Sequence, residues 1–180
     1  MSDLCWEKEF QAYGTIRIFE KRAKRLQTLR TWITFMGIVT PLVVGAAALA
    51  FGTESEVLSV FISAAAIVGL VQLVLSTWSI VARWDERYEY AVESIRDNTK
   101  IYNDFKRLSA EGVPDDDARV KIALEAYQRR EFSDISRNIT DKEKRFAARE
   151  SYKYFKKECH ICNEIPKTSK PGKCGGCGNF

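Results

Sequence analysis

Residues 31–53, TWITFMGIVTPLVVGAAALAFGT, and residues 57–82, VLSVFISAAAIVGLVQLVLSTWSIVA, contain no Asp, Glu, Lys or Arg. As a helix rising about 1.5 Å per residue, the shorter run would reach about 34 Å, whereas the hydrocarbon core of a bilayer is about 30 Å thick. The alternative is a pair of buried helices in a soluble bundle, but such helices rarely lack every charged residue. The two runs therefore predict membrane spans at about 31–53 and 57–82.

The charges around the two runs predict their orientation. Seven basic residues precede the first run: Lys8, Arg17, Lys21, Arg22, Lys24, Arg25 and Arg30. The connection at 53–56, TESE, has none, and Arg83, Arg87 and Arg96 follow the second run. Because Lys and Arg favour the cytoplasmic side, we expect both termini in the cytoplasm and the acidic connection outside. The basic cluster at 21–25 has either this topological role alone or a role in binding anionic lipid.

Two further features of the flanks agree with membrane spans. Tryptophans mark the predicted cytoplasmic end of both runs: Trp32, Trp78 and Trp84. Amphipathic rings of this kind favour the headgroup layer of a membrane. A cleaved signal peptide fits badly, because thirty mostly polar residues precede the first apolar run.

Small residues form a stripe along each run. The stripes comprise Thr34, Gly37, Pro41, Gly45, Ala48 and Gly52 in the first run, and Ser59, Ser63, Ala66, Gly69, Gln72, Ser76 and Ser79 in the second. Small faces let helices approach closely in lipid, so they predict packing within a hairpin and an oligomer. Alternatively, Gln72, Ser76 and Ser79 line a water-filled pore formed by several copies. The runs contain no charged residue, so nothing supports an ion-coupled pump.

The residues outside the two runs predict further helices. Apolar residues recur at helical steps within 1–30 and, apart from a gap at Thr99, within 84–108, so we expect an N-terminal helix and a continuation of the second span. Gly112 and Pro114 signal an end and a new start, which places a fourth helix from Pro114. Asp115, Asp116 and Asp117 would then occupy its first turn, where they either compensate the helix dipole or bind a divalent metal.

The pair Thr140 and Glu143 has the spacing of a capping box and predicts a fifth helix to about Lys157. No catalytic constellation accompanies these helices. The only histidine is His160, no glycine-rich loop suits a phosphate, and Cys5 is isolated and is interpreted as an ordinary thiol. We predict that the protein is not an enzyme.

The last 23 residues, ECHICNEIPKTSKPGKCGGCGNF, hold four of the five cysteines. Cys159, Cys162, Cys174 and Cys177 form two C-x2-C pairs separated by eleven residues, a spacing typical of a structural zinc site with four thiolates. A reducing cytoplasm disfavours disulfides, whereas an iron–sulfur centre, a redox pair or ligation by His160 are alternatives. A segment this short cannot fold without its metal.

Two other residue types in this segment carry expectations. The glycines at 175, 176 and 178 are expected to permit positive φ where the backbone folds around the metal. Lys167, Lys170 and Lys173 give the segment a basic face, which is compatible with nucleic-acid contact and equally with a solvated surface.

The order of an N-terminal helix, a tight two-span hairpin and a continuing helix resembles the SLATT family of prokaryotic two-transmembrane effectors. The spacing Cys159-x2-Cys162-x11-Cys174-x2-Cys177 resembles the signature of a family found on bacterial mobile elements. The resemblance implies a place beside nucleotide-signal synthases, sensor domains or reverse transcriptases in anti-phage systems. It also implies that the spans perforate or depolarise the inner membrane once infection is sensed.

These observations predict an all-α membrane protein: a two-span transmembrane hairpin with cytoplasmic helices and a small C-terminal zinc module. The expected segments are an amphipathic helix at 1–30, the hairpin at 31–82, a helical region at 83–158 and a zinc-ribbon-like tail at 159–180. The leading hypothesis is a homo-oligomeric effector that permeabilises the bacterial inner membrane in phage defence, together with a sensor or signal-generating protein encoded nearby. The alternative is a membrane-anchored adaptor whose zinc tail recruits a protein or nucleic acid.

Overall fold

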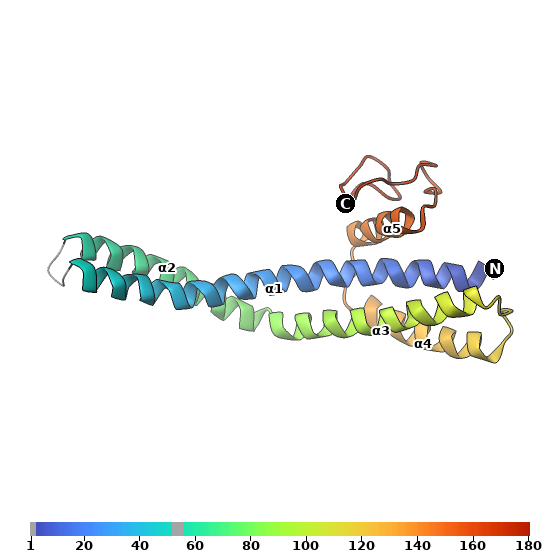
Figure 1. Cartoon of the computed structure of the whole chain (residues 1–180), viewed down its shortest axis with the longest axis horizontal. Coiled ribbons are helices and arrows are strands. Elements are labelled where there is room, and N and C mark those ends of the chain that lie inside the picture. Colours follow the sequence, from blue (N-terminus) through green and yellow to red (C-terminus); the bar gives the residue numbers. More distant parts are fainter. Residues whose placement is uncertain (1–2, 52–55) are drawn as a thin grey trace. The chain divides into compact units, whose positions relative to one another are not determined.

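The computed structural model describes residues 3–51 and 56–180, and its regular elements are all α-helices. They are α1 (Asp3–Phe51), α2 (Glu56–Val81), α3 (Trp84–Ala110), α4 (Ala118–Ile135) and α5 (Asp141–Phe155), followed by an irregular C-terminal segment (Figure 1). The predicted all-α class is confirmed. Residues 53–55 of the predicted acidic connection lie outside the described residues.

The chain divides into two compact units. Residues Met1–Arg22 and Tyr90–Phe180 form one, here called the terminal unit, and Ala23–Glu89 form the other, here called the central unit. Both predicted apolar runs lie in the central unit, whereas the cysteines lie in the terminal unit. The helices α1 and α3 contribute to both units, because the boundaries between the units fall within them, after Arg22 in α1 and after Glu89 in α3.

Two helices are long and apolar enough to cross a membrane, one within Leu4–Ala50 and one within Leu58–Val81. Their most apolar 18-residue windows have mean hydropathies of 2.1 and 2.4, and only 6% of each window is buried. The core helix of a soluble protein would be mostly buried, because its apolar side chains gain stability by leaving water. These two helices instead carry large apolar side chains on their surfaces, such as Leu49, Leu70 and Ile80.

The helix α1 runs without interruption through Gly14 and Pro41. The predicted continuation of the second apolar run into the following helix, in contrast, was wrong at one point. The helix α2 ends at Val81 and α3 begins at Trp84, because Arg83 adopts the left-handed conformation with φ 51°. Neither glycine nor proline lies at this break, so the sequence contains no helix-stop residue that would signal it.

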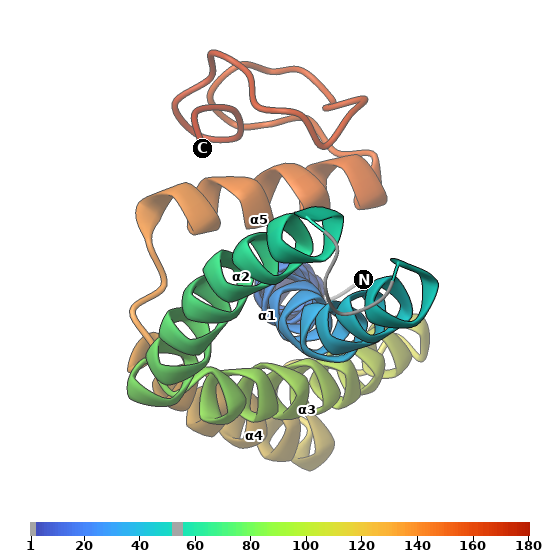
Figure 2. The same cartoon turned by 90° about the vertical axis from the view of Figure 1, so that its left-hand side faces the viewer.

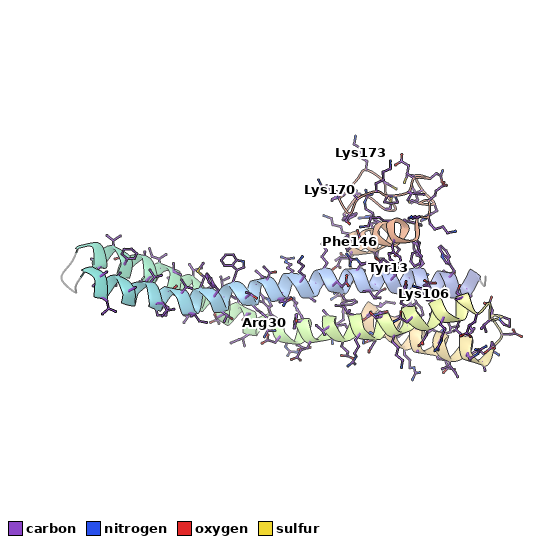
Figure 3. The ribbon with its side chains drawn as sticks, in the orientation of Figure 1. Tyr13, Arg30, Lys106, Phe146, Lys170 and Lys173 are labelled. Carbon is purple, nitrogen blue, oxygen red and sulfur yellow. The ribbon has the colours of Figure 1, made fainter. Side chains whose placement is uncertain are left out.

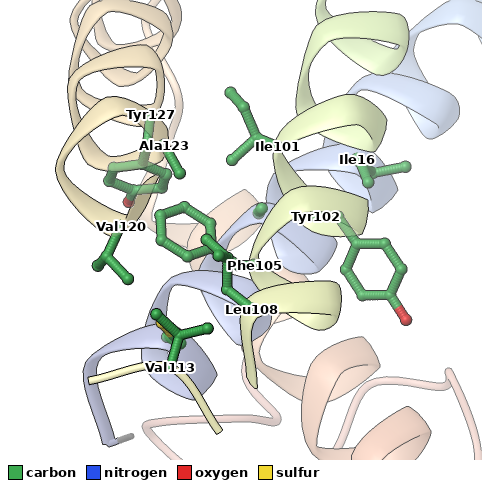
Figure 4. Close-up of a cluster of buried hydrophobic side chains, with 11 residues drawn as sticks. Ile16, Ile101, Tyr102, Phe105, Leu108, Val113, Val120, Ala123 and Tyr127 are labelled. Carbon is green, nitrogen blue, oxygen red and sulfur yellow. The ribbon is translucent and has the colours of Figure 1, made fainter. Parts of the chain in front are cut away.

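The core of the terminal unit lies between α1, α3 and α4. Phe105 is fully buried, and Ile16, Ile101, Leu108, Val120 and Tyr127 pack around it (Figure 4). Within this unit, the beginning of α1 lies between α5 on one side and α3 with α4 on the other (Figures 1 and 2). An amphipathic stripe on α3 packs against apolar residues of α1 and α4 to form this core, as the helical spacing of the apolar residues predicts.

The contact between α1 and α5 is close because Gly14 has no side chain. A Cβ at this position would lie 3.0 Å from the Ser151 hydroxyl and 3.2 Å from the Ala147 Cβ. The Ser151 hydroxyl donates to the Phe10 carbonyl at 3.0 Å, and the rings of Tyr13 and Tyr154 stack with centroids 4.3 Å apart. This contact attaches α5, and with it the cysteine segment, to α1.

A buried carboxylate joins α4 to α3. Asp134 is 2% exposed and accepts hydrogen bonds from Ser94 and Asn98 of α3 and from Arg130 of its own helix. The Tyr90 hydroxyl donates to it as well, at 2.8 Å. A buried carboxylate is costly unless it is paired and hydrogen-bonded, and this one satisfies both conditions. The network therefore fixes the register between α3 and α4.

The helix ends follow the predicted signals in two cases and differ in a third. Gly112, two residues after the end of α3, has φ 65°, and Thr140 and Glu143 form both hydrogen bonds of the predicted capping box. The fourth helix, however, begins at Ala118 and not at Pro114. Asp117 is its N-cap and accepts from the Arg119 amide at 2.8 Å. An aspartate cap stabilises the helix start more directly than an aspartate within the first turn, which explains the later start.

Candidate metal centre

Four cysteine sulfurs converge in the C-terminal segment. The Sγ atoms of Cys159, Cys162, Cys174 and Cys177 all lie within 4.8 Å of one another. The Cys159–Cys174 and Cys162–Cys177 Sγ distances are 4.0 and 3.8 Å. A tetrahedral zinc ion with bonds of about 2.3 Å requires about 3.8 Å between sulfurs, and a disulfide requires about 2.05 Å. The four side chains therefore fit a tetrahedral metal such as zinc, and their separations exclude disulfides in this structure.

The backbone repeats one turn at both cysteine pairs. The Asn163 amide donates to the Cys159 carbonyl at 2.7 Å, and the Gly178 amide donates to the Cys174 carbonyl at 2.9 Å. Each donor directly follows the second cysteine of its pair. The shared turn is what brings both sulfurs of a pair to the same side, as a common metal ligand set requires.

The predicted reason for the glycines was wrong. Among the described glycines only Gly112 has a positive φ, and in this segment it is Asn163 that adopts one, at 53°. Gly178 is needed for space instead, because a Cβ there would lie 2.7 Å from the Cys174 amide nitrogen. Asparagine tolerates the left-handed region because its short polar side chain bonds locally. Close approach of two backbone segments is therefore what requires glycine in this turn.

The thiols differ in their surroundings. Backbone amides of Cys177 and Gly176 lower the pKa of Cys174 to about 7, and the Gly176 nitrogen lies 3.4 Å from the sulfur. Burial raises the pKa of Cys177 above its usual range. Metal ligation requires thiolates. Because the pKa of Cys177 is raised and that of Cys174 is lowered, a bound cation would have to displace a more tightly held proton at Cys177 than at Cys174. A resident zinc ion would supply a structural cross-link between the two turns.

Arginines of α5 bind the cysteine segment through its backbone. Arg149 donates from Nε to the Thr168 carbonyl at 2.7 Å and from Nη1 to the Cys177 carbonyl at 3.2 Å. Arg145 donates to the Asn179 carbonyl at 2.5 Å. These donors satisfy carbonyls that no regular secondary structure uses. Sequence reasoning missed both arginines, since their helical spacing of four resembles that of any solvated helix face.

Side-chain contacts complete the attachment. The ring of Phe146 packs edge-on against Phe180, with centroids 5.4 Å apart, and Lys153 donates to Ser169. His160, the alternative ligand, lies outside the sulfur cluster, and its Nδ1 forms a 2.7 Å hydrogen bond with the Tyr152 hydroxyl. His160 therefore contacts α5 in this structure, whereas the four cysteines form the candidate centre.

The charge of this region is uneven. Residues 141–180 contain ten Lys and Arg and five Asp and Glu, a net charge of +5 that exceeds the +4 of the whole chain. Lys167, Lys170 and Lys173 are exposed, and Figure 3 shows Lys170 and Lys173 on the outer side of the cysteine segment. Zinc with four thiolates has a net charge of −2, so part of this positive charge would compensate the metal centre.

Of the predicted polar stripe in the second apolar run, Gln72 contacts α1. Gln72 donates from Nε2 to the Ile33 carbonyl at 3.2 Å, and Ser79 donates to the Ser76 carbonyl at 2.7 Å. A Cβ on Gly37 would lie only 2.6 Å from the Gln72 Nε2, so the glycine makes room for the amide. Gln72, Ser76 and Ser79 are half-buried, whereas Ser59, Ser63, Ala66 and Gly69 of the same predicted stripe are exposed.

The three aspartates at 115–117 do not join the candidate centre. Among the described residues, the only group of metal-binding side chains is the four-cysteine cluster. Asp117 caps α4, and its pKa is lowered by hydrogen bonds from the side chain and backbone of Arg119. This supports a helix-start role for Asp117.

Comparison with known proteins gives one match. The model of the family described as "Mobilome CxxCx(11)CxxC protein" matches residues 2–180. No curated protein and no solved structure matches the chain. The family match covers both apolar helices as well as the cysteine segment, and its description contains the spacing found here.

Proposed function

We propose a membrane function for this chain, which belongs to the Mobilome CxxCx(11)CxxC protein family. In this proposal the two apolar helices form a transmembrane hairpin and the cysteine segment is a structural zinc module. The protein acts as a non-enzymatic effector that oligomerises and permeabilises the bacterial inner membrane in a phage-defence or mobile-element conflict system. A sensor or signal-generating protein encoded nearby would activate it.

The observation that carries the proposal is the outward-facing apolar surface of the central unit. Leu49 is 91% exposed, Ile80 is 78% exposed and Val60 is 68% exposed. Monomeric soluble proteins rarely expose continuous apolar patches of more than a few hundred Å². A hydrocarbon environment removes this cost, and both helices are long enough to cross it.

Orientation and segment roles are part of the proposal. The excess of Lys and Arg before the first apolar helix and after the second supports a cytoplasmic location for both termini. On this basis residues 1–30, 83–158 and 159–180 are cytoplasmic and 31–82 form the hairpin. A reducing compartment keeps the four cysteines available as thiolate ligands, in agreement with a zinc module.

The exposed small residues of α2 support oligomerisation. Ser59, Ser63 and Gly69 are exposed, and a Cβ on Gly69 would meet no atom within 4 Å. Small faces favour close helix packing in lipid, where apolar side chains gain little by leaving their solvent. Two helices cannot enclose a channel, so permeabilisation requires several copies of the chain.

A second candidate function follows from Gln72. Its amide already bonds to α1 within the hairpin, which supports a packing role for this residue over pore lining. If the hairpin serves only as an anchor, the protein is a membrane-bound adaptor, and the zinc module with its basic surface recruits a protein or a nucleic acid.

A membrane-potential dye separates the two functions. The full chain is expressed together with the genes beside it, and the dye is read before and after the system is triggered. The effector proposal predicts loss of potential in triggered cells, and retained potential would reject it in favour of the adaptor. Depolarisation that persists in the Gln72→Leu, Ser76→Ala double variant would assign these two residues to packing.

A further inference from the structure

An open groove of about 500 Å³ lies in the central unit, at the basic end of the first apolar run. Gln27, Arg30, Thr31, Phe35 and Ile38 of α1 contribute to its lining, and Tyr88 of α3 contributes from the opposite side. Apart from the adjacent pair Arg30 and Thr31, the α1 residues recur at steps of three or four, so they share one face of the helix. The groove therefore follows the helix axis for about 16 Å at 1.5 Å per residue.

The groove changes from polar to apolar along its length. Gln27, Arg30 and Thr31 occupy the end that precedes the apolar run, whereas Phe35 and Ile38 lie one and two turns further along. A phospholipid has the same division, with a charged headgroup at one end and an acyl chain at the other. An acidic peptide or a nucleic acid would match the polar end alone and leave Phe35 and Ile38 without a partner.

Arg30 is held in position at the polar end. Its Nε lies 3.1 Å from the Asp85 Oδ1, and its guanidinium lies 5.4 Å from the centre of the Tyr88 ring. Within the described residues, neither Nη atom of Arg30 forms a hydrogen bond. A guanidinium fixed at one edge and open at the other suits bidentate binding of a phosphate.

Further cations surround this end. Lys24 lies one turn before Gln27 on the same face of α1, and Arg87 directly precedes Tyr88. Among the residues that the structure describes, neither forms an ion pair with an acid. The nearby acids Asp85 and Glu86 pair with Arg30 and Arg83, respectively, and Glu89 also lies on this part of α3. The side chains of Lys24 and Arg87 are therefore available to bind an external anion.

We propose that this groove binds an anionic phospholipid, with the phosphate at Arg30 and Lys24 and an acyl chain along Phe35 and Ile38. The inference rests on the proposed membrane function, because the occupant is a bilayer lipid. It adds a specific lipid class to that function: a site at the basic end of the hairpin that distinguishes anionic from zwitterionic lipid.

Quenching of tryptophan fluorescence by brominated lipids tests this site, because Trp32, Trp78 and Trp84 lie near the same end of the two helices. The full chain is reconstituted into phosphatidylcholine vesicles that contain brominated phosphatidylglycerol or brominated phosphatidylcholine at the same fraction. We expect stronger quenching by phosphatidylglycerol, and Arg30→Gln should lower its relative binding constant about fivefold, the usual effect of one cation at an anionic surface.

Two variants separate lipid binding from a structural role of Arg30. Asp85→Asn also removes the ion pair but frees the guanidinium, so it should strengthen the preference for phosphatidylglycerol, whereas weakening would overturn the proposal. The matched control is Arg25→Gln, which removes a cation from the opposite face of α1 and should change the constant less than twofold. An equal loss in Arg25→Gln would reduce the effect to general surface charge and reject the site.

The same measurement distinguishes failure of the lipid site from failure of the membrane function. Quenching by neither brominated lipid would mean that the hairpin is outside the bilayer and would reject the membrane function together with the site. Equal quenching by both lipids would reject the site alone. Glycerol phosphate added in solution should leave the preference unchanged, and displacement of lipid by it would overturn the role of Phe35 and Ile38.

Discussion

The central and terminal units of this protein are both built of helices, but the terminal unit buries its large apolar side chains and the central unit exposes them. In the terminal unit Phe105 and Val120 are 0% and 1% exposed, whereas in the central unit Leu70 and Val74 are 66% and 59% exposed. The helix α3 has an apolar stripe on a polar background, whereas α2 is apolar on all sides. The difference agrees with the proposed membrane function, in which water surrounds the first unit and hydrocarbon surrounds the second.

The source of stability differs accordingly. Burial of apolar area and the Asp134 network hold the terminal unit together, and a metal bound by the four cysteines would add a cross-link. In a bilayer that driving force is absent between helices, so close packing at Gly37 and the Gln72 hydrogen bond would carry more of the association. The following changes are expected to act on one unit and leave the other unaffected.

The largest expected effect is loss of the metal in Cys177→Ser. Removal of one of four thiolates should reduce bound zinc from about one ion per chain to less than about a tenth, because apparent zinc affinities of such sites reach about 10–16 kcal/mol and depend on the full ligand set. Elemental analysis of the purified full chain measures this. Cys5→Ala, outside the cluster, should retain the ion, and a wild-type protein without near-stoichiometric zinc contradicts the assignment.

The second largest effect is expected from an arginine placed on an exposed apolar position, which should affect the central unit much more than the terminal unit. Leu70→Arg places a cation near the middle of α2 and should oppose membrane insertion by about 2.5–3.5 kcal/mol, so the protein leaves the membrane fraction. Phe132→Arg, at a residue of α4 that is 83% exposed, should shift stability by less than about 0.5 kcal/mol. Similar fractionation of both variants would remove the distinction between the units.

Acid should destabilise the terminal unit first. Burial opposes ionisation of Glu143, but hydrogen bonds from Arg22 and Thr140 outweigh it, so its pKa lies below the ordinary 4.5. For Glu150, burial is likewise outweighed by the hydrogen bonds of Ser169 and Lys153. A lowered folded-state pKa stabilises the fold above pH 4.5, and this contribution is lost as the pH falls through the folded-state value.

Urea unfolding of the full chain at pH 6 and pH 3.5, followed by near-ultraviolet circular dichroism, measures this pH effect. The unfolding midpoint should be lower at pH 3.5, and Glu143→Gln should reduce the difference between the two values. A midpoint that rises on acidification would show that neither carboxylate contributes in the ionised form.

The smallest expected effect concerns Gln72. Gln72→Leu removes its hydrogen bond to Ile33 and should weaken the hairpin by about 0.6 kcal/mol, the average for such bonds in membranes. Unfolding of the full chain in detergent micelles is the measurement, with Thr77→Val, which replaces a hydroxyl bonded only to its own helix, as the control. A stabilised Gln72→Leu hairpin would assign the amide to another role.

Part of this structure was predictable from local sequence. Thr140 with Glu143, Gly112 and the cysteine spacing all act through neighbours in the chain, so their patterns predicted a cap, a helix end and a sulfur cluster. The break at Arg83 and the late start of α4 at Ala118 were missed, because the period of apolar residues does not report a single left-handed residue or choose between adjacent aspartate caps.

Long-range contacts were less accessible to sequence reasoning. Arg145 and Arg149 bind carbonyls 19 to 34 residues away, and no spacing rule predicts such donors. Gln72 was singled out from its stripe, but only the structure shows its contact with Ile33 and the space that Gly37 leaves for it. These partners depend on how whole helices pack, which local pattern does not determine.

Thiol labelling in intact bacteria tests the central claim most directly, namely that α1 and α2 cross the membrane with both termini inside. Ser55→Cys lies between the two helices, and the full-length variant is exposed to a membrane-impermeant maleimide. We predict labelling of Ser55→Cys and none of the wild type, whose five cysteines would all be cytoplasmic. An unlabelled variant, or a wild type labelled before the cells are opened, would contradict the transmembrane hairpin.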